Sequence, residues 1–475
     1  MNWIFYRTIV LWFHSILTIF VCIKMISLFC ILASSILTPK YLRKELHGIE
    51  PLTFKQKTDH NDNSNTNYFD QRYFEVWNQD PKDDAPVILK VGGESDALTP
   101  GGNGTDFITV LAKDINAAVV LTLEHRYFGK SFPTTTTTVA DYALLTVEQA
   151  LADLKYFQEE YVKAHPNLKS SKWLIVGGSY PGALSAIARA IYPDNFHAAI
   201  SSSGVVYASD DFKDFDLQDA VSMGQECAAA ARAARIKIDQ MIDDPSTNEY
   251  IKNLFGAAGL TDQNFRFVIG EIFTLALQYN HVEKVCGPLV DSLRSGDDAI
   301  MALAKFTKDY FIPTFCDGDL ARTYSDDEMK KMASTTENVA PRSWLWMTCN
   351  ELAYWQTSPG RLGLRSPKLD KESYQEQCRN VFGDGIKPNP EAFNQKYGGL
   401  TQTIDRVYYT TGSQDPWTWA CVTEDSGVQS GSYAHTITGP NMGHCSDLHA
   451  PSPNDPIDLV RTRKHMREVI KGWMN

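Results

Sequence analysis

One short segment constrains the fold of this chain more than any other, the sequence GGSYPG at residues 177–182. It contains Gly-x-Ser-x-Gly directly after the apolar run at 173–176 and shortly before an expected helix at 184–192. A serine at such a sharp strand-to-helix turn has a strained backbone, and its small neighbours let other chain segments approach closely. The hydroxyl group then projects from the carboxyl edge of the sheet, beside a helix N-terminus that can bind an anion. The segment predicts a reactive Ser179 in an α/β fold; the alternative is a glycine-rich turn whose serine only caps the helix.

Strand and helix patterns alternate around this turn. Runs rich in β-branched and apolar residues recur at 87–91, 117–123, 173–176 and 198–201. Residues 146–164 carry apolar side chains three or four positions apart, the pattern of an amphipathic helix, and Pro166 follows them. This order predicts a mostly parallel sheet with helices on both faces.

The pattern changes between about residue 208 and about residue 400, where helix patterns dominate and β-rich runs are scarce. The clearest patterns from here on are the helices at 220–241 and 264–279, the strands at 406–410 and 435–438, and a last helix at 456–473. We therefore expect an α/β domain in two parts, 38–207 and 401–475, with a helical insertion at 208–400.

The first 37 residues differ from the rest of the chain. From residue 8 to residue 37 the sequence is almost wholly apolar, interrupted by His14 and Lys24. The piece that begins at Met25 has a preceding basic residue, an apolar stretch and a small-residue exit, as a secretory signal does. Met25 is the true start, or residues 1–24 lengthen the signal. The alternative is an uncleaved membrane anchor; cleavage would leave no stable membrane insertion.

Composition excludes two classes of protein. With 43% hydrophobic residues, the 475-residue chain can form a packed core, so intrinsic disorder is excluded for its bulk. The formal charge of −12 and the lack of a basic patch disfavour nucleic acid as a partner. There is no Cys-x-x-Cys pair, and we expect neither a metal nor a cofactor.

The cysteines and a glycosylation motif agree with a secretory route. Nine cysteines occur, two of them inside the predicted signal, and an odd number, seven, remains, so at least one is free or bonded elsewhere. Asn103 begins the sequence Asn-Gly-Thr, an acceptor for N-glycosylation.

A serine hydroxyl needs a base and an orienting acid to become a nucleophile, and this fold class supplies them in the order serine, acid, histidine. Asp415 follows the expected strand at 406–410, and His444 follows the one at 435–438. Because the carboxyl ends of parallel strands meet at one edge of a sheet, we expect both side chains near Ser179.

Other residues compete for these roles. Asp415 could merely begin an Asp-Pro turn, and Asp425 and Asp447 lie nearby, although neither directly follows a strand. His435 lies within a strand and His449 lies further along the chain, so either can be a surface histidine. His125 precedes an arginine in a loop, where a structural role is the simpler interpretation.

Together these motifs resemble the serine peptidase family that includes lysosomal prolyl carboxypeptidase, dipeptidyl peptidase II and thymus-specific serine protease. The segments that carry the resemblance are GGSYPG at 177–182, QDPW at 414–417, GHCSDL at 443–448, FKQKTDH at 54–60, YFDQRYF at 68–74, VGGES at 91–95, EHRYFGKS at 124–131 and TCNELAYWQTS at 348–358. The similarity runs from about residue 53 to the end of the chain.

The resemblance implies an α/β-hydrolase fold with a large helical cap inserted between nucleophile and acid. It implies an exopeptidase of the secretory pathway, lysosomal, vacuolar or secreted, that acts on peptides at acidic pH and often next to proline. In such an enzyme Ser179 attacks the peptide carbonyl, His444 is the base, and Asp415 orients it. The amides of Tyr180 and Gly93 form the oxyanion hole.

The resemblance leaves the substrate open. Glu94 or Glu351 could bind a free amine, and Arg126 could bind a free carboxylate, so a carboxypeptidase and a dipeptidyl peptidase are both open. Trp417 could form one wall of a proline pocket, or it is a core aromatic residue. Ala183 replaces a bulkier residue of the prolyl carboxypeptidase pattern, which puts strict proline preference in doubt.

Further expectations concern disulfides and alternatives. The resemblance implies the pair Cys349–Cys378, and the proximity of Cys421 and Cys445 to the triad loops suggests a second pair. An esterase or lipase of the same fold, and a non-catalytic binding protein on this scaffold, are the alternative functions. The sequence leaves a homodimer open.

Overall fold

The computed structural model describes residues 50–78, 80–96, 106–336 and 338–475. The predicted signal at 1–37 and the glycosylation motif at Asn103 lie outside these residues.

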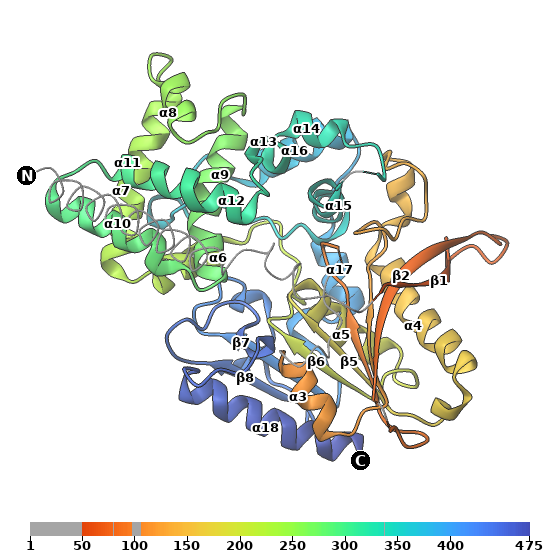
Figure 1. Ribbon diagram of the computed structural model, residues 1–475. Helices are drawn as coiled ribbons and strands as arrows, with labels where there is room; N and C mark the ends of the chain where they lie inside the picture. Colours follow the sequence, from red (N-terminus) through yellow and green to blue (C-terminus); the bar gives the residue numbers. More distant parts are fainter. Residues whose placement is uncertain (1–49, 79, 97–105, 337) are drawn as a thin grey trace, which may run out of the picture.

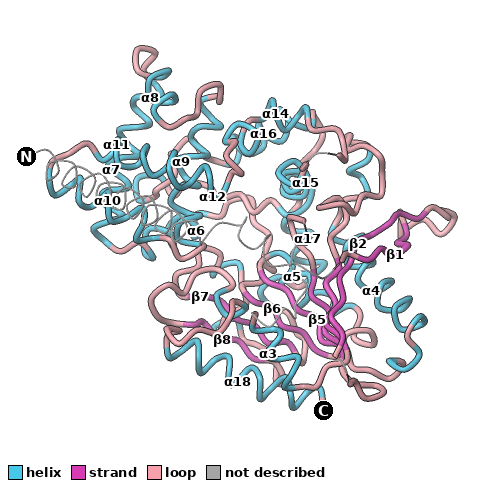
Figure 2. Tube along the Cα trace, in the orientation of Figure 1, coloured by secondary structure: helices cyan, strands magenta, loops and turns pink. Residues whose placement is uncertain are grey.

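The centre of the molecule is one sheet of eight strands, in the order β1-β2-β4-β3-β5-β6-β7-β8. The strands are β1 (Leu52–Lys57), β2 (Tyr68–Trp77), β3 (Val87–Val91), β4 (Val119–Leu123), β5 (Trp173–Gly178), β6 (Ala198–Ser202), β7 (Val407–Gly412) and β8 (Tyr433–Ile437). From β4 to β8 all neighbours are parallel, whereas β1 and β2 are antiparallel. Figures 1 and 2 show β1 and β2 as a long hairpin that projects from one side of the sheet.

Helices cover both faces of the sheet. The helices α4 (Val147–Ala164) and α5 (Tyr180–Ile191) pack on one face, and α3 (Phe107–Asp114) and α18 (Ile457–Met474) pack on the other. Strand β5 is buried on both sides, because Trp173 and Ile175 belong to the first core and Leu174 and Val176 to the second. A strand buried on both faces reads as a continuous apolar run, which is why the pattern was visible in the sequence.

Between β6 and β7 all described elements are helical (Figure 1). They are α6 (Lys213–Ser222), α7 (Gln225–Asp243), α8 (Asn248–Leu254), α9 (Asp262–Gln278), α10 (Val282–Ser295), α11 (Ala299–Phe306), η3 (Thr307–Phe311), α12 (Ile312–Phe315), α13 (Leu320–Tyr324), α14 (Asp326–Lys331), α15 (Ala340–Met347), η4 (Thr348–Leu352), η5 (Gly360–Leu362), α16 (Lys371–Phe382), α17 (Pro390–Tyr397) and η6 (Gly399–Thr401). We call this set the cap. The helices from α7 to α13 have an apolar core of their own, whereas those from α15 to α17 pack into the same core as one face of the sheet.

Short single-turn helices complete the α/β part. They are η1 (Asp141–Leu144), η2 (Pro166–Leu168), η7 (Thr418–Ala420), η8 (Glu424–Ser426) and η9 (Ser446–Leu448).

One expectation about secondary structure needs correction. The single helix expected at 220–241 is divided between α6 and α7, because Gly224 has a φ of +78°, a left-handed conformation that a helix cannot continue through. The expected mostly parallel sheet is confirmed, with antiparallel pairing only where β1 meets β2 and β2 meets β4.

Two disulfides are present among the described residues, both in the cap. Cys227 is bonded to Cys286, and Cys349 is bonded to Cys378, the pair that the resemblance implied. The suggested pair of Cys421 and Cys445 is wrong, since both are free. Their sulfur atoms face different backbone carbonyls, Cys421 that of Trp417 and Cys445 that of Ser202.

The mixed eight-stranded sheet, the serine at the turn after β5 and the helices on both faces confirm the predicted α/β-hydrolase fold. Within the described ranges, no helix combines the length and the apolar character needed to cross a bilayer.

Candidate active site

Ser179 lies at the turn between β5 and α5, as the sequence predicts. Its φ of +65° and ψ of −135° are unusual for a residue with a side chain, and such strain persists only where the surroundings enforce it. The amide of Ser179 donates to the carbonyl of Ser202 on β6, at 2.9 Å. A Cβ at Gly182 would lie 2.9 Å from that same carbonyl oxygen, so the turn requires glycine there. The hydroxyl is thus held at the carboxyl edge of the sheet.

Asp415 and His444 form a hydrogen-bonded pair on the loops after β7 and β8. The His444 Nδ1 lies 2.8 Å from Asp415 Oδ2, and a carboxylate there accepts the Nδ1 proton. Asp415 is fully buried, and its Oδ1 accepts from the amide of Trp417 at 3.0 Å. This tautomer leaves the Nε2 lone pair of His444 available to accept a proton.

The nucleophile turn and the histidine loop are in contact. A Cβ at Gly178 would lie 2.8 Å from the sulfur of Cys445, so the residues that precede Ser179 and follow His444 touch. The His444 Nε2 is buried and has no hydrogen-bond partner in the described part of the chain, the Ser179 hydroxyl included. Hydrogen bonds between catalytic groups often tighten only when substrate is bound. The structure therefore places the Asp415–His444 pair next to the nucleophile turn, without a hydrogen bond between His444 and Ser179.

Two cap residues hold the histidine loop in place. The carbonyl of Gln278, at the end of α9, accepts from the His444 amide at 2.9 Å, and the Oδ1 of Asn280 accepts from the Gly443 amide at 2.9 Å. Sequence analysis did not identify either residue. Both lie in a stretch whose only visible signal is helical periodicity, and the contact depends on how the cap packs onto the sheet.

The two amides expected to bind an oxyanion lie beside the nucleophile. Tyr180 is the first residue of α5, so its amide has no partner within the helix. Gly93 packs against the nucleophile turn, since a Cβ there would lie 2.7 Å from the ring of Pro181. The Tyr180 side chain is fixed by His125, whose Nε2 lies 3.0 Å from the tyrosine hydroxyl. His125 is therefore a buried structural residue, and burial lowers its pKa to about 4.

Glu94 and Glu351 occupy different environments. Burial raises the pKa of each to about 7. The Glu351 carboxylate accepts from the amide of Val147 at 2.7 Å and so caps α4. The Glu94 carboxylate has no hydrogen-bond or ion-pair partner among the described residues apart from its own amide, and the charge of His444 acts on it. Of the two, only Glu94 is free to bind a ligand beside the catalytic histidine.

Trp417 lies above the histidine within a group of aromatic rings. Its ring centroid is 6.5 Å from that of His444, 4.7 Å from Phe215 and 5.7 Å from Tyr354. Its indole N–H donates to the Gln278 side chain at 3.1 Å. The ring is partly exposed and packs against the core of the α/β part.

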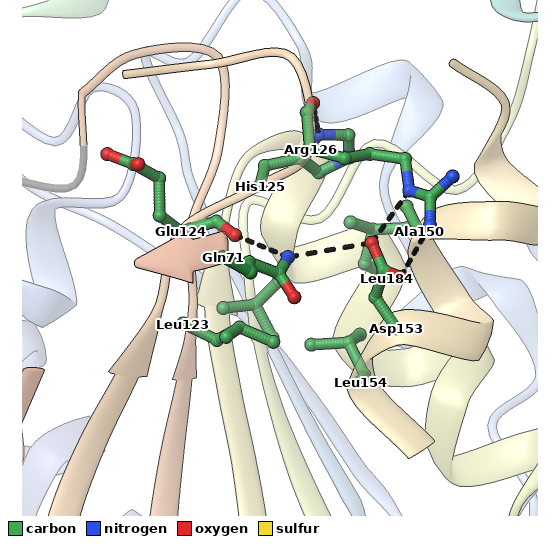
Figure 3. Close-up of a pocket in the computed structure, with 11 residues that line it drawn as sticks. Gln71, Leu123, Glu124, His125, Arg126, Ala150, Asp153, Leu154 and Leu184 are labelled. Carbon is green, nitrogen blue, oxygen red and sulfur yellow. Dashed lines mark hydrogen bonds and ion pairs between the residues drawn. The ribbon is translucent and has the colours of Figure 1, made fainter. Parts of the chain in front are cut away.

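Arg126 is fully buried and cannot reach a substrate. Its guanidinium group binds Asp153 through two hydrogen bonds of 2.6 and 2.7 Å (Figure 3). Figure 3 shows this pair at a small pocket behind the nucleophile turn, where Gln71 connects Asp153 to the carbonyl of Glu124. No triad residue lines this pocket. Arg126 therefore stabilises the fold and is not a candidate for binding a substrate carboxylate.

The rival acids and bases have other partners or lie apart. His435 is placed between Glu424 and Asp458 at the sheet edge, with nitrogen–oxygen distances of 3.0 and 3.2 Å. Asp425 and His449 are exposed. Within the described ranges, no three His, Cys, Asp or Glu side chains are grouped to hold a metal ion.

The charge on His444 determines the expected pH dependence. Burial is the largest single effect and lowers the pKa of His444, but the Asp415 carboxylate and the Cys445 side chain together outweigh it, and the net pKa is well above 6.5. The base acts only when Nε2 is unprotonated, so kcat/KM should rise with pH through a midpoint above 6.5. The measurement is kcat/KM from about pH 4 to about pH 9, with melting temperatures to show that the protein stays folded. Full activity in the acidic range, which the resemblance implied, would contradict this expectation.

Comparisons with known proteins place the chain in a family of serine peptidases. A model of the family described as Serine carboxypeptidase S28 matches residues 56–466. A probable serine protease of Arabidopsis thaliana is 32% identical over 445 residues, which cover 89% of this chain and 88% of the relative. The thymus-specific serine protease of Mus musculus is 28% identical, over 86% of this chain and 84% of its own length. The lysosomal Pro-X carboxypeptidase of Mus musculus is 25% identical, over 88% of this chain and 89% of its own length.

Proposed function

The chain belongs to the Serine carboxypeptidase S28 family, and from this premise we propose that it is a serine exopeptidase that removes dipeptides from the free amino end of peptides. That it is a serine-type peptidase follows from the family. The choice of the amino end depends on one observation: the Glu94 carboxylate has no bonding partner among the described residues other than its own amide, and the charge of His444 acts on its pKa.

The proposed reaction uses the triad in the usual order. The Nε2 of His444 takes the proton of the Ser179 hydroxyl as its oxygen attacks the scissile carbonyl carbon. His444 then gives that proton to the leaving amine, and the C–N bond breaks. The acyl-enzyme on Ser179 is hydrolysed by water in the same way. Asp415, fully buried, keeps the histidine in the required tautomer and stabilises its charged form.

The amides of Tyr180 and Gly93 are proposed to donate to the oxyanion. The N-terminus of α5 adds a favourable field for the negative charge at this position. Such a donor contributes about 3–4 kcal/mol to the transition state in comparable enzymes.

Glu94 is proposed to bind the substrate ammonium group. Glu94 directly follows Gly93, whose amide is proposed to bind the scissile carbonyl, so the carboxylate lies close to the scissile bond. Each residue of an extended peptide spans about 3.3–3.6 Å, so Glu94 can reach an amine no more than about two residues away from that bond. Glu94 is half-buried, and a carboxylate that loses part of its hydration without gaining a partner is destabilised, which its raised pKa of about 7 reflects. An ammonium ligand would offset this cost. Arg126, the cation considered for a substrate carboxylate, is occupied by Asp153.

The substitution Glu94→Gln tests this role. We expect kcat/KM for a peptide with a free amine to fall about 10–100-fold, because a charge-assisted hydrogen bond is lost, while the N-acetylated peptide stays within about twofold. The peptides carry either proline or alanine before the scissile bond, because Ala183 leaves the preference for proline undecided. Glu351→Gln is the matched control, since that carboxylate has the same raised pKa but caps a helix.

The pH dependence of the same assay gives an independent readout. Glu94 loses its charge below about pH 7, and the substrate amine loses its charge above about pH 8. The preference for the free amine should therefore decline on both sides of this range. An equal fall with both peptides, or activity that depends on a free carboxyl end, would refute the amino-end proposal and leave the peptidase activity intact.

We also propose that the protein matures in the secretory pathway and acts in a lysosome, a vacuole or outside the cell. The two cap disulfides favour an oxidising compartment. One of the relatives is named as lysosomal.

A further inference from the structure

A second buried carboxylate lies close to the triad and has no part in the reaction above. Asp447 follows His444 by three residues in the same loop and is 1% exposed. Its Oδ1 accepts from the Ser202 hydroxyl at 2.5 Å, and its Oδ2 accepts from the Thr410 hydroxyl at 2.9 Å. Ser202 ends β6 and Thr410 lies near the end of β7. One carboxylate thus ties the histidine loop to two adjacent strands.

Ser202 also holds the nucleophile. Its backbone carbonyl accepts from the Ser179 amide at 2.9 Å, while its hydroxyl donates to Asp447. The next residue, Ser203, accepts from the Cys445 amide at 2.9 Å through its hydroxyl. The backbone of the nucleophile and the loop of the base are therefore both hydrogen-bonded to the end of β6.

The histidine loop needs such support. Cys445 has a φ of +54°, a left-handed conformation that is costly for a residue with a side chain. Asp447 is buried, and a buried carboxylate is tolerated only when its oxygens accept hydrogen bonds. The hydroxyl groups of Ser202 and Thr410 supply these bonds. The conformation of the histidine loop and the burial of the Asp447 carboxylate therefore depend on each other.

We propose that Asp447, with Ser202 and Thr410, is a positioning residue that sets the distance between the His444 imidazole and the Ser179 hydroxyl. The proposal rests on the proposed function, since it requires Ser179 and His444 to be nucleophile and base. An error of about 1 Å in such a distance can cost about 100-fold in rate.

The test compares two variants that each remove one buried threonine–aspartate hydrogen bond. Thr410→Val removes the donor to Asp447, and Thr274→Val removes the donor to Asp219, a buried carboxylate in the cap, at 2.6 Å. For each we would measure the rate constant for phosphonylation of Ser179 by a fluorophosphonate, kcat, KM and the melting temperature. Phosphonylation needs the nucleophile and base but no peptide-binding residue.

We expect both variants to lose thermal stability, Thr274→Val at least as much because its hydroxyl also accepts from Arg365 at 2.9 Å, and only Thr410→Val to react slowly. Its phosphonylation rate constant and kcat should fall about 10–100-fold with KM within about threefold. Thr410→Ser, which keeps the hydroxyl group, should restore both rates. Ser202→Ala, which keeps the carbonyl that binds Ser179, should resemble Thr410→Val and serves if that variant does not fold.

The outcomes separate the two proposals. If the unmodified protein does not react with the fluorophosphonate, the proposed function fails. The positioning proposal has a different failing result. If the unmodified protein reacts, but Thr410→Val and Ser202→Ala react as fast per folded molecule as Thr274→Val, Asp447 has only a structural role and the positioning proposal is overturned.

Discussion

Replacing Ser179 with alanine should abolish turnover while leaving the fold intact. The substitution removes the only atom of the triad that forms a bond with the substrate, and loss of the nucleophile in a comparable serine peptidase lowers kcat by about 10⁶-fold. The Cβ atom stays, so the strained backbone at φ +65° is not altered further. The measurement is peptide hydrolysis together with the melting temperature.

Ser170→Ala provides the matched control for this result. Ser170 is an exposed serine shortly before β5, and only its backbone amide forms a hydrogen bond, to Asp84. We expect it to keep wild-type activity. Turnover by the Ser179→Ala protein at more than about a thousandth of the wild-type rate would show that another residue is the nucleophile.

Asp415→Asn should have the second-largest effect, about 10⁴-fold on kcat. An asparagine oxygen can still accept from the Trp417 amide, so the loop should stay in place. The amide group, however, can donate to Nδ1 and favour the tautomer with its proton on Nε2, which cannot act as a base. The measurement is kcat at a pH where the wild-type enzyme is fully active.

The same variant also tests the origin of the pH dependence. The Asp415 charge raises the pKa of His444, so its removal should shift the acidic limb of residual activity to lower pH. Asp425→Asn, in the same loop but exposed, should change neither kcat nor the limb. Retention of more than about a tenth of the wild-type kcat by Asp415→Asn would contradict the assignment of the acid.

The positions of Ser179, Asp415 and His444 could be predicted from the sequence because each follows a strand that the sequence pattern marks, buried in β5 and β7 and partly exposed in β8. The apolar runs before Ser179, Asp415 and His444 correspond to β5, β7 and β8 within about two residues at most ends. Parallel strands present their carboxyl ends at one edge, so residues hundreds of positions apart converge there. The strand pattern and the fixed geometry of parallel sheets therefore carry the prediction.

The support of the triad could not be predicted in this way. Asp447 was visible only as a rival for the acid, because its bonds to Ser202 and Thr410 join positions 245 and 37 residues apart and have no local pattern. The contact of Gln278 with the histidine loop depends on the packing of the cap. Proximity in sequence also failed for Cys421 and Cys445, whose sulfur atoms face different carbonyls.

The alternative functions differ from the peptidase in measurable ways. A non-catalytic binding protein would not react with a fluorophosphonate, whereas an esterase would react but would not cleave peptides. The family and the intact Asp415–His444 pair at 2.8 Å favour the peptidase.

The most direct measurement of the central claim is peptide mapping by mass spectrometry after the protein has been inactivated with a fluorophosphonate. We expect one phosphonyl group per molecule, attached to Ser179, and loss of peptide hydrolysis in proportion to its incorporation. A phosphonyl group on another residue, or full hydrolysis by protein that carries the group on Ser179, would contradict the account.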